Sequence, residues 1–146
     1  ALHRLCLNLA KQIVVDGEGA KKFITINVIG ARSQSMAKSV GFSIANSPLF
    51  KTAMGAGDPN WGRIIMACGK SGENIIANKI RLKIGNYLVA EGGKVAKDYK
   101  ENDVKEYMKW SSINIEVNLN IGSASHTVYT CDFTHDYIDI NANYRN

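Results

Sequence analysis

The sequence of 146 residues has no long apolar run and little cysteine or proline. No stretch approaches the ~18 apolar residues that a membrane-spanning helix needs, so we expect no membrane partner. Its three cysteines, Cys6, Cys68 and Cys131, are widely spaced without a CxxC pair, which predicts buried thiols in a reducing, cytoplasmic compartment. The 45% hydrophobic and 21% charged content is typical of globular proteins and predicts a single domain over residues 1–146.

Motifs that carry catalysis or metal binding are also missing. The three histidines, His3, His126 and His135, lie outside any nucleophile motif. The sequence contains no HExxH, clustered Cys/His or EF-hand spacing, and its glycine pairs match no phosphate-binding loop. We therefore expect no metal site and no complete catalytic apparatus within these residues.

The net charge of +5 comes from 18 basic and 13 acidic residues. Such a surplus can attract nucleic acid, but the bases are scattered and no aromatic residues alternate with them. The pattern favours a solvated basic face and predicts no nucleic-acid partner.

Apolar periodicity predicts helices in the first half of the chain, with one strand between them. Residues 2–15 and 33–46 have helical spacing, whereas residues 23–29 alternate as a strand. The short apolar run at 64–69 fits a buried helix or a buried strand, and we favour a helix begun by Asn60. The chain opens with alanine and no preceding capping residue, so we expect a further segment upstream.

The second half is richer in strands. Two hairpins are predicted, one joining residues 79–84 to 87–90 and one joining residues 113–119 to 126–131. Between them Asp103 and Glu106 have the spacing of a capping box, and a short helix with an ordered tail follows from residue 132. Together the elements predict an α+β domain of mostly antiparallel strands covered by helices.

Residues 57–63, GDPNWGR, form the densest cluster of unusual residues. Glycine and proline require a bend there, and a tryptophan in a bend is costly unless it is buried or holds a ligand. One interpretation is a rigid corner that Trp61 seals, with Arg63 bonding carbonyls or a carboxylate. The other is the wall of a site.

Two further places suit binding. Glu18 lies between two glycines, where a carboxylate can meet an ammonium group, although a helix-ending turn with a solvated acid fits the same spacing. Residues 140–146 carry amides, an aromatic ring and a base to the last position, so this tail either docks onto the fold or lines a pocket.

These segments, in order and over nearly the whole chain, resemble the C-terminal part of a known family. The family is the bifunctional ornithine acetyltransferase/glutamate N-acetyltransferase of arginine biosynthesis. The matching runs are residues 10–14 (AKQIV), 16–20 (DGEGA), 44–49 (IANSPL), 51–53 (KTA), 57–63 (GDPNWGR), 131–132 (CD), 136–137 (DY) and 140–145 (INAxYR, with any residue at 143).

The resemblance implies a cytoplasmic enzyme made as one precursor that cleaves itself before a threonine. That threonine carries the acetyl group from N-acetylornithine to glutamate, and some members also accept acetyl-CoA as donor. The implied fold is a layered α/β sandwich, and the implied partners are an α chain and an upstream segment of the β chain, in a hetero-oligomer. No threonine here has the cleavage motif, so the resemblance assigns the nucleophile to an upstream segment and predicts that these residues alone are inactive.

Three positions match substrate-binding residues of the family: Glu18, which fits the ornithine ammonium, Asn141, and the last residue, Asn146. The family usually ends in threonine or serine, and an asparagine there still donates and accepts hydrogen bonds.

Two other classes of function fit parts of the sequence. A related self-cleaving hydrolase of the aminopeptidase type would share the architecture, although the tail and residues 58–63 argue against it. A non-catalytic module that binds small amino acids or anions would fit the basic charge.

Overall fold

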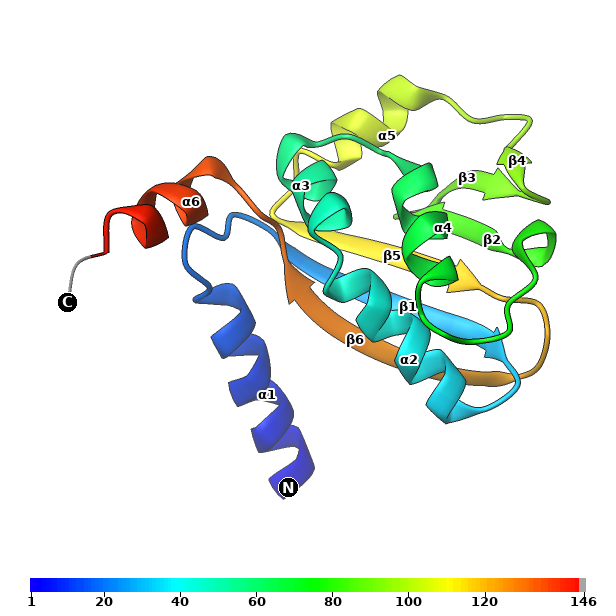
Figure 1. Ribbon diagram of the computed structural model, residues 1–146, viewed down its shortest axis with the longest axis horizontal. Coiled ribbons are helices and arrows are strands. Elements are labelled where there is room, and N and C mark those ends of the chain that lie inside the picture. Colours follow the sequence, from blue (N-terminus) through cyan, green and yellow to red (C-terminus); the bar gives the residue numbers. More distant parts are fainter. Residues whose placement is uncertain (145–146) are drawn as a thin grey trace.

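The computed structural model describes residues 1–144 (Figure 1). Six strands form one sheet, and helices pack on it or extend from it. The elements are α1 (Leu2–Val15), β1 (Phe23–Ala31), α2 (Gln34–Ala45), α3 (Pro48–Ala56), α4 (Trp61–Gly69), a 3-10 turn (Ala77–Lys79), β2 (Arg81–Ile84), β3 (Tyr87–Glu91), β4 (Lys94–Val95), α5 (Glu101–Tyr107), β5 (Ser112–Asn118), β6 (Ala124–Cys131) and α6 (His135–Ala142).

The strands lie in the order β4-β3-β2-β5-β1-β6. β1 pairs in parallel with β5 and antiparallel with β6, so that Ile26 faces Ile115 on one side and Val128 on the other. The other pairings among the described strands are antiparallel. The predicted α+β class with mostly antiparallel strands covered by helices is confirmed.

The second predicted hairpin is wrong, because β1 lies between β5 and β6. The connection between these two strands passes the end of β1, where Leu119 N–H donates to the Ile29 carbonyl and Ile121 N–H to the Gly30 carbonyl. Alternation of apolar residues specifies which face of a strand is buried but does not specify its neighbour.

One face of the sheet carries the core. Ile24, Ile26 and Val28 on β1 are fully buried. Helix α2 packs on β1 and β6, and α3 and α4 lie on the same face of the sheet (Figure 1). The opposite face is more polar: Thr127 Oγ1 donates to Asn27 Oδ1 at 2.9 Å, Lys83 pairs with Glu116, and Phe23 stacks on Tyr129. The buried face therefore supplies the hydrophobic stabilisation, at about 1.5–3 kcal/mol for each fully buried large aliphatic side chain.

Side-chain caps begin α2 and α4, whereas α5 begins without one. Ser33 Oγ accepts from Met36 N–H at the start of α2, and Asn60 caps α4 as predicted. The predicted capping box at Asp103 is wrong. Helix α5 begins at Glu101, two residues before Asp103, and its N-cap, Lys100, makes no side-chain cap bond. Asp103 therefore lies in the first helical turn, where its charge suits the helix dipole.

Helix α1 extends away from the sheet, and none of its residues is buried (Figure 1). Several of its apolar side chains are at least half exposed, among them Leu2, Leu5, Leu9 and Ile13. The prediction of three buried thiols is wrong for Cys6, which lies on this helix and is exposed, and holds for Cys68. No helix of the described residues has the length and apolarity to cross a membrane.

Candidate functional site

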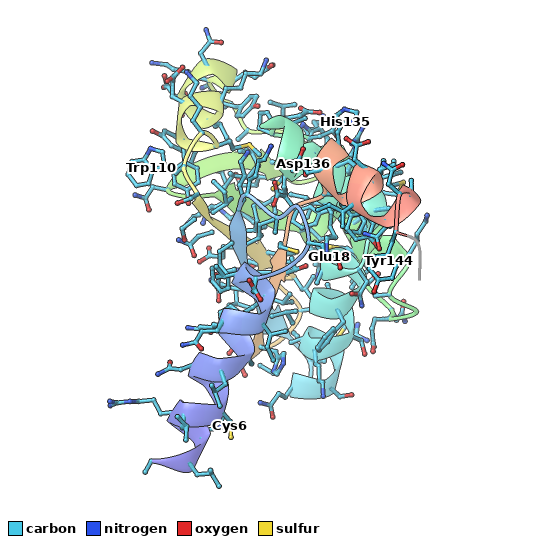
Figure 2. The ribbon with its side chains drawn as sticks, turned by 90° about the vertical axis from the view of Figure 1, so that its left-hand side faces the viewer. Cys6, Glu18, Trp110, His135, Asp136 and Tyr144 are labelled. Atoms are coloured by element: carbon cyan, nitrogen blue, oxygen red, sulfur yellow. The ribbon has the colours of Figure 1, made fainter. Side chains whose placement is uncertain are left out.

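The loop between α1 and β1 brings Glu18 close to α6 (Figure 2). Gly19 has φ +68° and leaves no room for a side chain, since a Cβ there would lie 2.5 Å from the Tyr137 backbone nitrogen. Only glycine gives both the left-handed conformation and this close approach. The loop and the start of α6 are therefore in direct backbone contact.

Helix α6 is held at its start by the segment that follows β6. Thr134 Oγ1 donates to the Gly19 carbonyl at 2.7 Å, and Phe133 N–H donates to the Lys51 carbonyl at 3.1 Å. The Phe133 ring stacks on Tyr137 with centroids 4.8 Å apart, and the Lys51 ammonium lies 4.2 Å from the Phe133 centroid. These contacts link α6 both to the Glu18 loop and to α3.

Two of the three predicted binding residues lie together here. Asn141 Nδ2 donates to Glu18 Oε2 at 2.8 Å and to the Tyr137 carbonyl at 2.9 Å, although Glu18 and Asn141 are 123 positions apart. Both residues are exposed, so their remaining oxygens can accept hydrogen bonds from a ligand. The pair suits an ammonium group, because the Glu18 carboxylate offers a charged acceptor and the Asn141 amide oxygen offers a neutral one. The third residue, Asn146, lies outside the described residues.

An ion pair flanks the Glu18–Asn141 pair. Lys21 Nζ lies 2.9 Å from Asp136 Oδ2. This hydrogen bond and the opposite charge lower the pKa of Asp136 and raise the pKa of Lys21. One charge of each sign therefore lies at the first turn of α6, where Figure 2 shows Asp136.

A cavity of about 840 Å³ opens between α3, α4 and the first turns of α6. Its walls combine apolar and polar side chains, among them Thr52, Arg63, Phe133, His135 and Tyr137. Arg63 Nη1 donates to the Leu49 carbonyl at 2.9 Å and to Thr52 Oγ1 at 3.2 Å. Since Tyr137 both lines the cavity and accepts from Asn141, the cavity adjoins the Glu18–Asn141 pair.

Residues 57–63 connect α3 to α4 and serve mainly as caps. Gly57 ends α3 in the left-handed conformation, and Asn60 Oδ1 accepts from Arg63 N–H at 3.3 Å. Pro59 is buried and Trp61 is half-buried against the core. The geometry favours the rigid-corner interpretation, with Arg63 alone reaching the cavity.

The remaining reactive groups give no catalytic cluster. No set of three His, Cys, Asp or Glu side chains within residues 1–144 could hold a metal ion. Burial raises the pKa of the Cys68 thiol to about 12, so it stays protonated and unreactive. Cys131 is half-buried, with the Lys51 ammonium 3.7 Å from its sulfur.

Sequence reasoning missed Asp132 and Thr134 as contacts of the Glu18 loop. Both act through backbone atoms of that loop, more than 100 positions away. The run CD at 131–132 belongs to the family resemblance and so marked Asp132 as a residue of interest. Its position in the sequence, however, does not indicate which residues it contacts.

Comparison with known proteins shows the family. The family model of ArgJ matches residues 1–146. The chain belongs to the ArgJ family. Among curated ArgJ proteins it is similar to the arginine biosynthesis bifunctional protein ArgJ of Ruegeria pomeroyi, with 50% identity over 145 residues, and to that of Zymomonas mobilis, with 46% identity over 145 residues. Each match covers 99% of this chain and 36% of the relative, so the chain spans about a third of their length.

The fold is also that of a solved ArgJ. The crystal structure of the arginine biosynthesis bifunctional protein ArgJ from Bacillus halodurans matches with a TM-score of 0.94 and 40% identity. The match covers 98% of this chain and 67% of that chain. The mixed sheet and its helices therefore have the same architecture as the matched part of that ArgJ structure.

Proposed function

We propose that this chain supplies substrate-binding residues to an acetyltransferase that moves acetyl from N2-acetyl-L-ornithine to L-glutamate in arginine biosynthesis. Membership of the ArgJ family supports the reaction, since its members are named arginine biosynthesis bifunctional proteins. The observation that carries the assignment to these residues is the 2.8 Å contact between Glu18 and Asn141, which joins two positions predicted to bind substrate.

In this proposal Glu18 binds the side-chain ammonium of acetylornithine. The acetylated α-nitrogen is neutral, so the only cation of that substrate is at the end of its side chain. A carboxylate oriented by an amide suits this cation, and a charge-assisted hydrogen bond is about twice as strong as a neutral one. Asn141 fixes the Glu18 carboxylate and offers its own oxygen to the same ligand.

The transfer proceeds in two steps through an acetyl-threonine. The threonine oxygen attacks the acetyl carbon, and the α-amine of ornithine leaves with a proton. The α-amine of glutamate then attacks the ester carbon, and the threonine hydroxyl is regenerated. We assign this threonine, and the groups that stabilise the oxyanion, to a part of the enzyme beyond these 146 residues, so this chain alone is inactive.

The assignments of partner chains, compartment and acetyl donor rest on the family resemblance. The partners are the α chain and the upstream segment of the β chain from one self-cleaving precursor, assembled as a hetero-oligomer in the cytoplasm, without nucleic acid or membrane. The exposed apolar side chains of α1 support a contact with further protein, because such a row in water usually marks an interface. No cofactor is required, and acetyl-CoA is an alternative acetyl donor.

The test is acetyl transfer by the protein at the full length of its relatives. We expect turnover of N-acetylornithine with glutamate, and a second assay replaces N-acetylornithine with acetyl-CoA. Release of free acetate or peptide-amide hydrolysis without acetylglutamate would contradict the proposal.

Glu18→Gln tests the role of the carboxylate. It removes the charge that attracts the ornithine ammonium, so KM for N-acetylornithine rises at least about tenfold, the size of a lost charge-assisted contact. KM for glutamate does not rise, because glutamate carries a carboxylate at the end of its side chain. Glu91→Gln, an exposed glutamate of β3 paired with Arg81, is the matched control and leaves both constants unchanged. Equal increases for both substrates would show that Glu18 does not distinguish them.

A further inference from the structure

Asp132 is a buried carboxylate at the junction of β6 and α6. Its residue is only 2% exposed. Oδ1 accepts from the backbone N–H groups of both Lys21 and Lys22, each at 2.9 Å. Burying a carboxylate is costly unless hydrogen bonds compensate it. Two N–H donors do so at Oδ1, whereas Oδ2 is buried without a hydrogen-bond partner among the described residues, so the carboxylate depends on these two contacts.

Lys22 supplies positive charge in the neighbourhood of Asp132, although the two form no ion pair among the described residues. The Lys22 ammonium donates to the Met54 carbonyl at 2.6 Å, near the end of α3, where a cation also suits the helix dipole. Burial lowers the pKa of Lys22, and the nearby charge of Asp132 opposes that decrease. Asp132 and Lys22 thus join the start of β1, the end of β6 and the end of α3.

The remaining ties between the Glu18 loop and α6 are more exposed or uncharged. Thr134 contributes one neutral hydrogen bond to Gly19. The side chains of Lys21 and Asp136 are 63% and 51% exposed, so water and salt weaken their attraction. Among the described contacts, Asp132 makes the one buried, charge-assisted link between the two segments that carry Glu18 and Asn141.

We infer that Asp132 is a positioning residue for the Glu18–Asn141 pair: its carboxylate sets the loop that carries Glu18 against the helix that carries Asn141. This inference rests on the proposed function for its effect on catalysis. Asp132 is buried and does not contact substrate, so it acts through Glu18. Its removal loosens the loop and α6 together and weakens binding of the ornithine ammonium.

Hydrogen exchange tests the tie without reference to activity. In the full-length protein, Asp132→Ala should speed amide exchange at residues 16–22 and 135–142 at least tenfold, while amides of α2 keep their rates. Asp132→Asn retains an oxygen that can accept from both N–H groups and should stay nearer to the wild type. Unchanged exchange in both segments of Asp132→Ala would overturn the inference, whatever reaction the enzyme catalyses.

Kinetics test whether the tie matters for substrate. With acetyl transfer by the wild type established, Asp132→Ala should raise KM for N-acetylornithine at least tenfold and change kcat per active site less than threefold. Active sites are counted from the acetyl-enzyme burst. Asp98→Ala, an exposed aspartate far from α6, is the control and leaves both constants unchanged.

A merely structural role gives a different result. It lowers the melting temperature and the number of active sites but leaves KM at its wild-type value, and that outcome overturns the inference. If Asp132→Ala does not fold, Asp132→Asn decides: a KM increase smaller than tenfold at constant kcat supports positioning, whereas an unchanged KM contradicts it. An inactive wild type contradicts the proposed function alone, since the exchange experiment still stands.

Discussion

The helix-covered sheet and the α1–loop–α6 end of the molecule are stabilised in different ways. In the sheet, side chains such as Ile26 and Ile115 are fully buried, and apolar contact on one face dominates. In α1 and α6 no residue is buried, and the position of α6 depends on a few polar contacts, on the Phe133–Tyr137 stack and on Gly19. The candidate binding residues lie in the second region. Rigid packing there is replaced by specific hydrogen bonds, so orientation and stability can change separately.

The largest expected difference between the two regions is in their response to loss of an apolar side chain. Ile26→Ala removes a fully buried side chain at the centre of the sheet and should lower the free energy of unfolding by about 2–5 kcal/mol. Ile13→Ala, at a position 74% exposed on α1, should change it by less than about 0.5 kcal/mol. Urea unfolding of the 146-residue chain measures both. Equal losses would show that α1 belongs to the same cooperative core.

The second comparison separates the energetic cost of backbone strain from the cost of a steric collision. Gly72→Ala forces a left-handed alanine into open space, at a cost of about 1–2 kcal/mol. Gly19→Ala adds a collision with the Tyr137 backbone and should cost about 1–3 kcal/mol more. Urea unfolding compares them, and ornithine affinity in the full-length enzyme should fall for Gly19→Ala only. Identical unfolding energies would mean that α6 moves aside freely.

A smaller effect is expected at the corner between α3 and α4. Asn60→Ala removes the side chain that caps α4 and should cost about 1 kcal/mol. Lys100 occupies the equivalent position of α5 without a side-chain cap bond, so Lys100→Ala is the matched control and should be neutral. Thermal unfolding of the two variants tests this, and a loss for Lys100→Ala as large as for Asn60→Ala would contradict the capping role.

The smallest effect is the pH dependence of the Lys21–Asp136 pair. Because the folded state lowers the pKa of Asp136, its contribution to stability is present above the ordinary aspartate pKa and is lost as pH falls through the lowered value. Because it raises the pKa of Lys21, that contribution is present below 10.5 and is lost as pH rises through the raised value. Asp136→Asn should therefore lower the melting temperature slightly at neutral pH and have no effect at the acid extreme. A constant difference at every pH would exclude the ion pair as its cause.

Local patterns in the sequence predicted most elements but not how they meet. The helical spacing of residues 33–46 predicted α2, whose buried face includes Met36, Val40 and Ile44, since helical period is a local property of the sequence. The partner of β5 was predicted wrongly, because the same alternation suits any neighbouring strand. Likewise Asp103 and Glu106 have the spacing of a capping box, but no helix begins at Asp103.

The candidate site shows the same limit. Glu18 and Asn141 were predicted from the family resemblance, and their substrate contacts stay predictions. Their mutual hydrogen bond follows from the fold, which brings the start of β1 beside the end of β6. Asp132 could not be assigned from its neighbours in sequence, because its function depends on backbone N–H groups that precede a strand more than 100 positions earlier.

The central strand β1 is synthesised well before either of its neighbours in the sheet. Its two neighbours in the sheet, β5 and β6, begin only at Ser112 and Ala124. At a ribosomal rate of about 5–20 residues per second, β1 waits roughly 4–16 seconds for its first strand partner to be made. By then α2, α3 and α4, which follow β1 directly in the chain, have been made and can shield its apolar face. The helices that cover the finished sheet are thus also the first available protection of its central strand against aggregation.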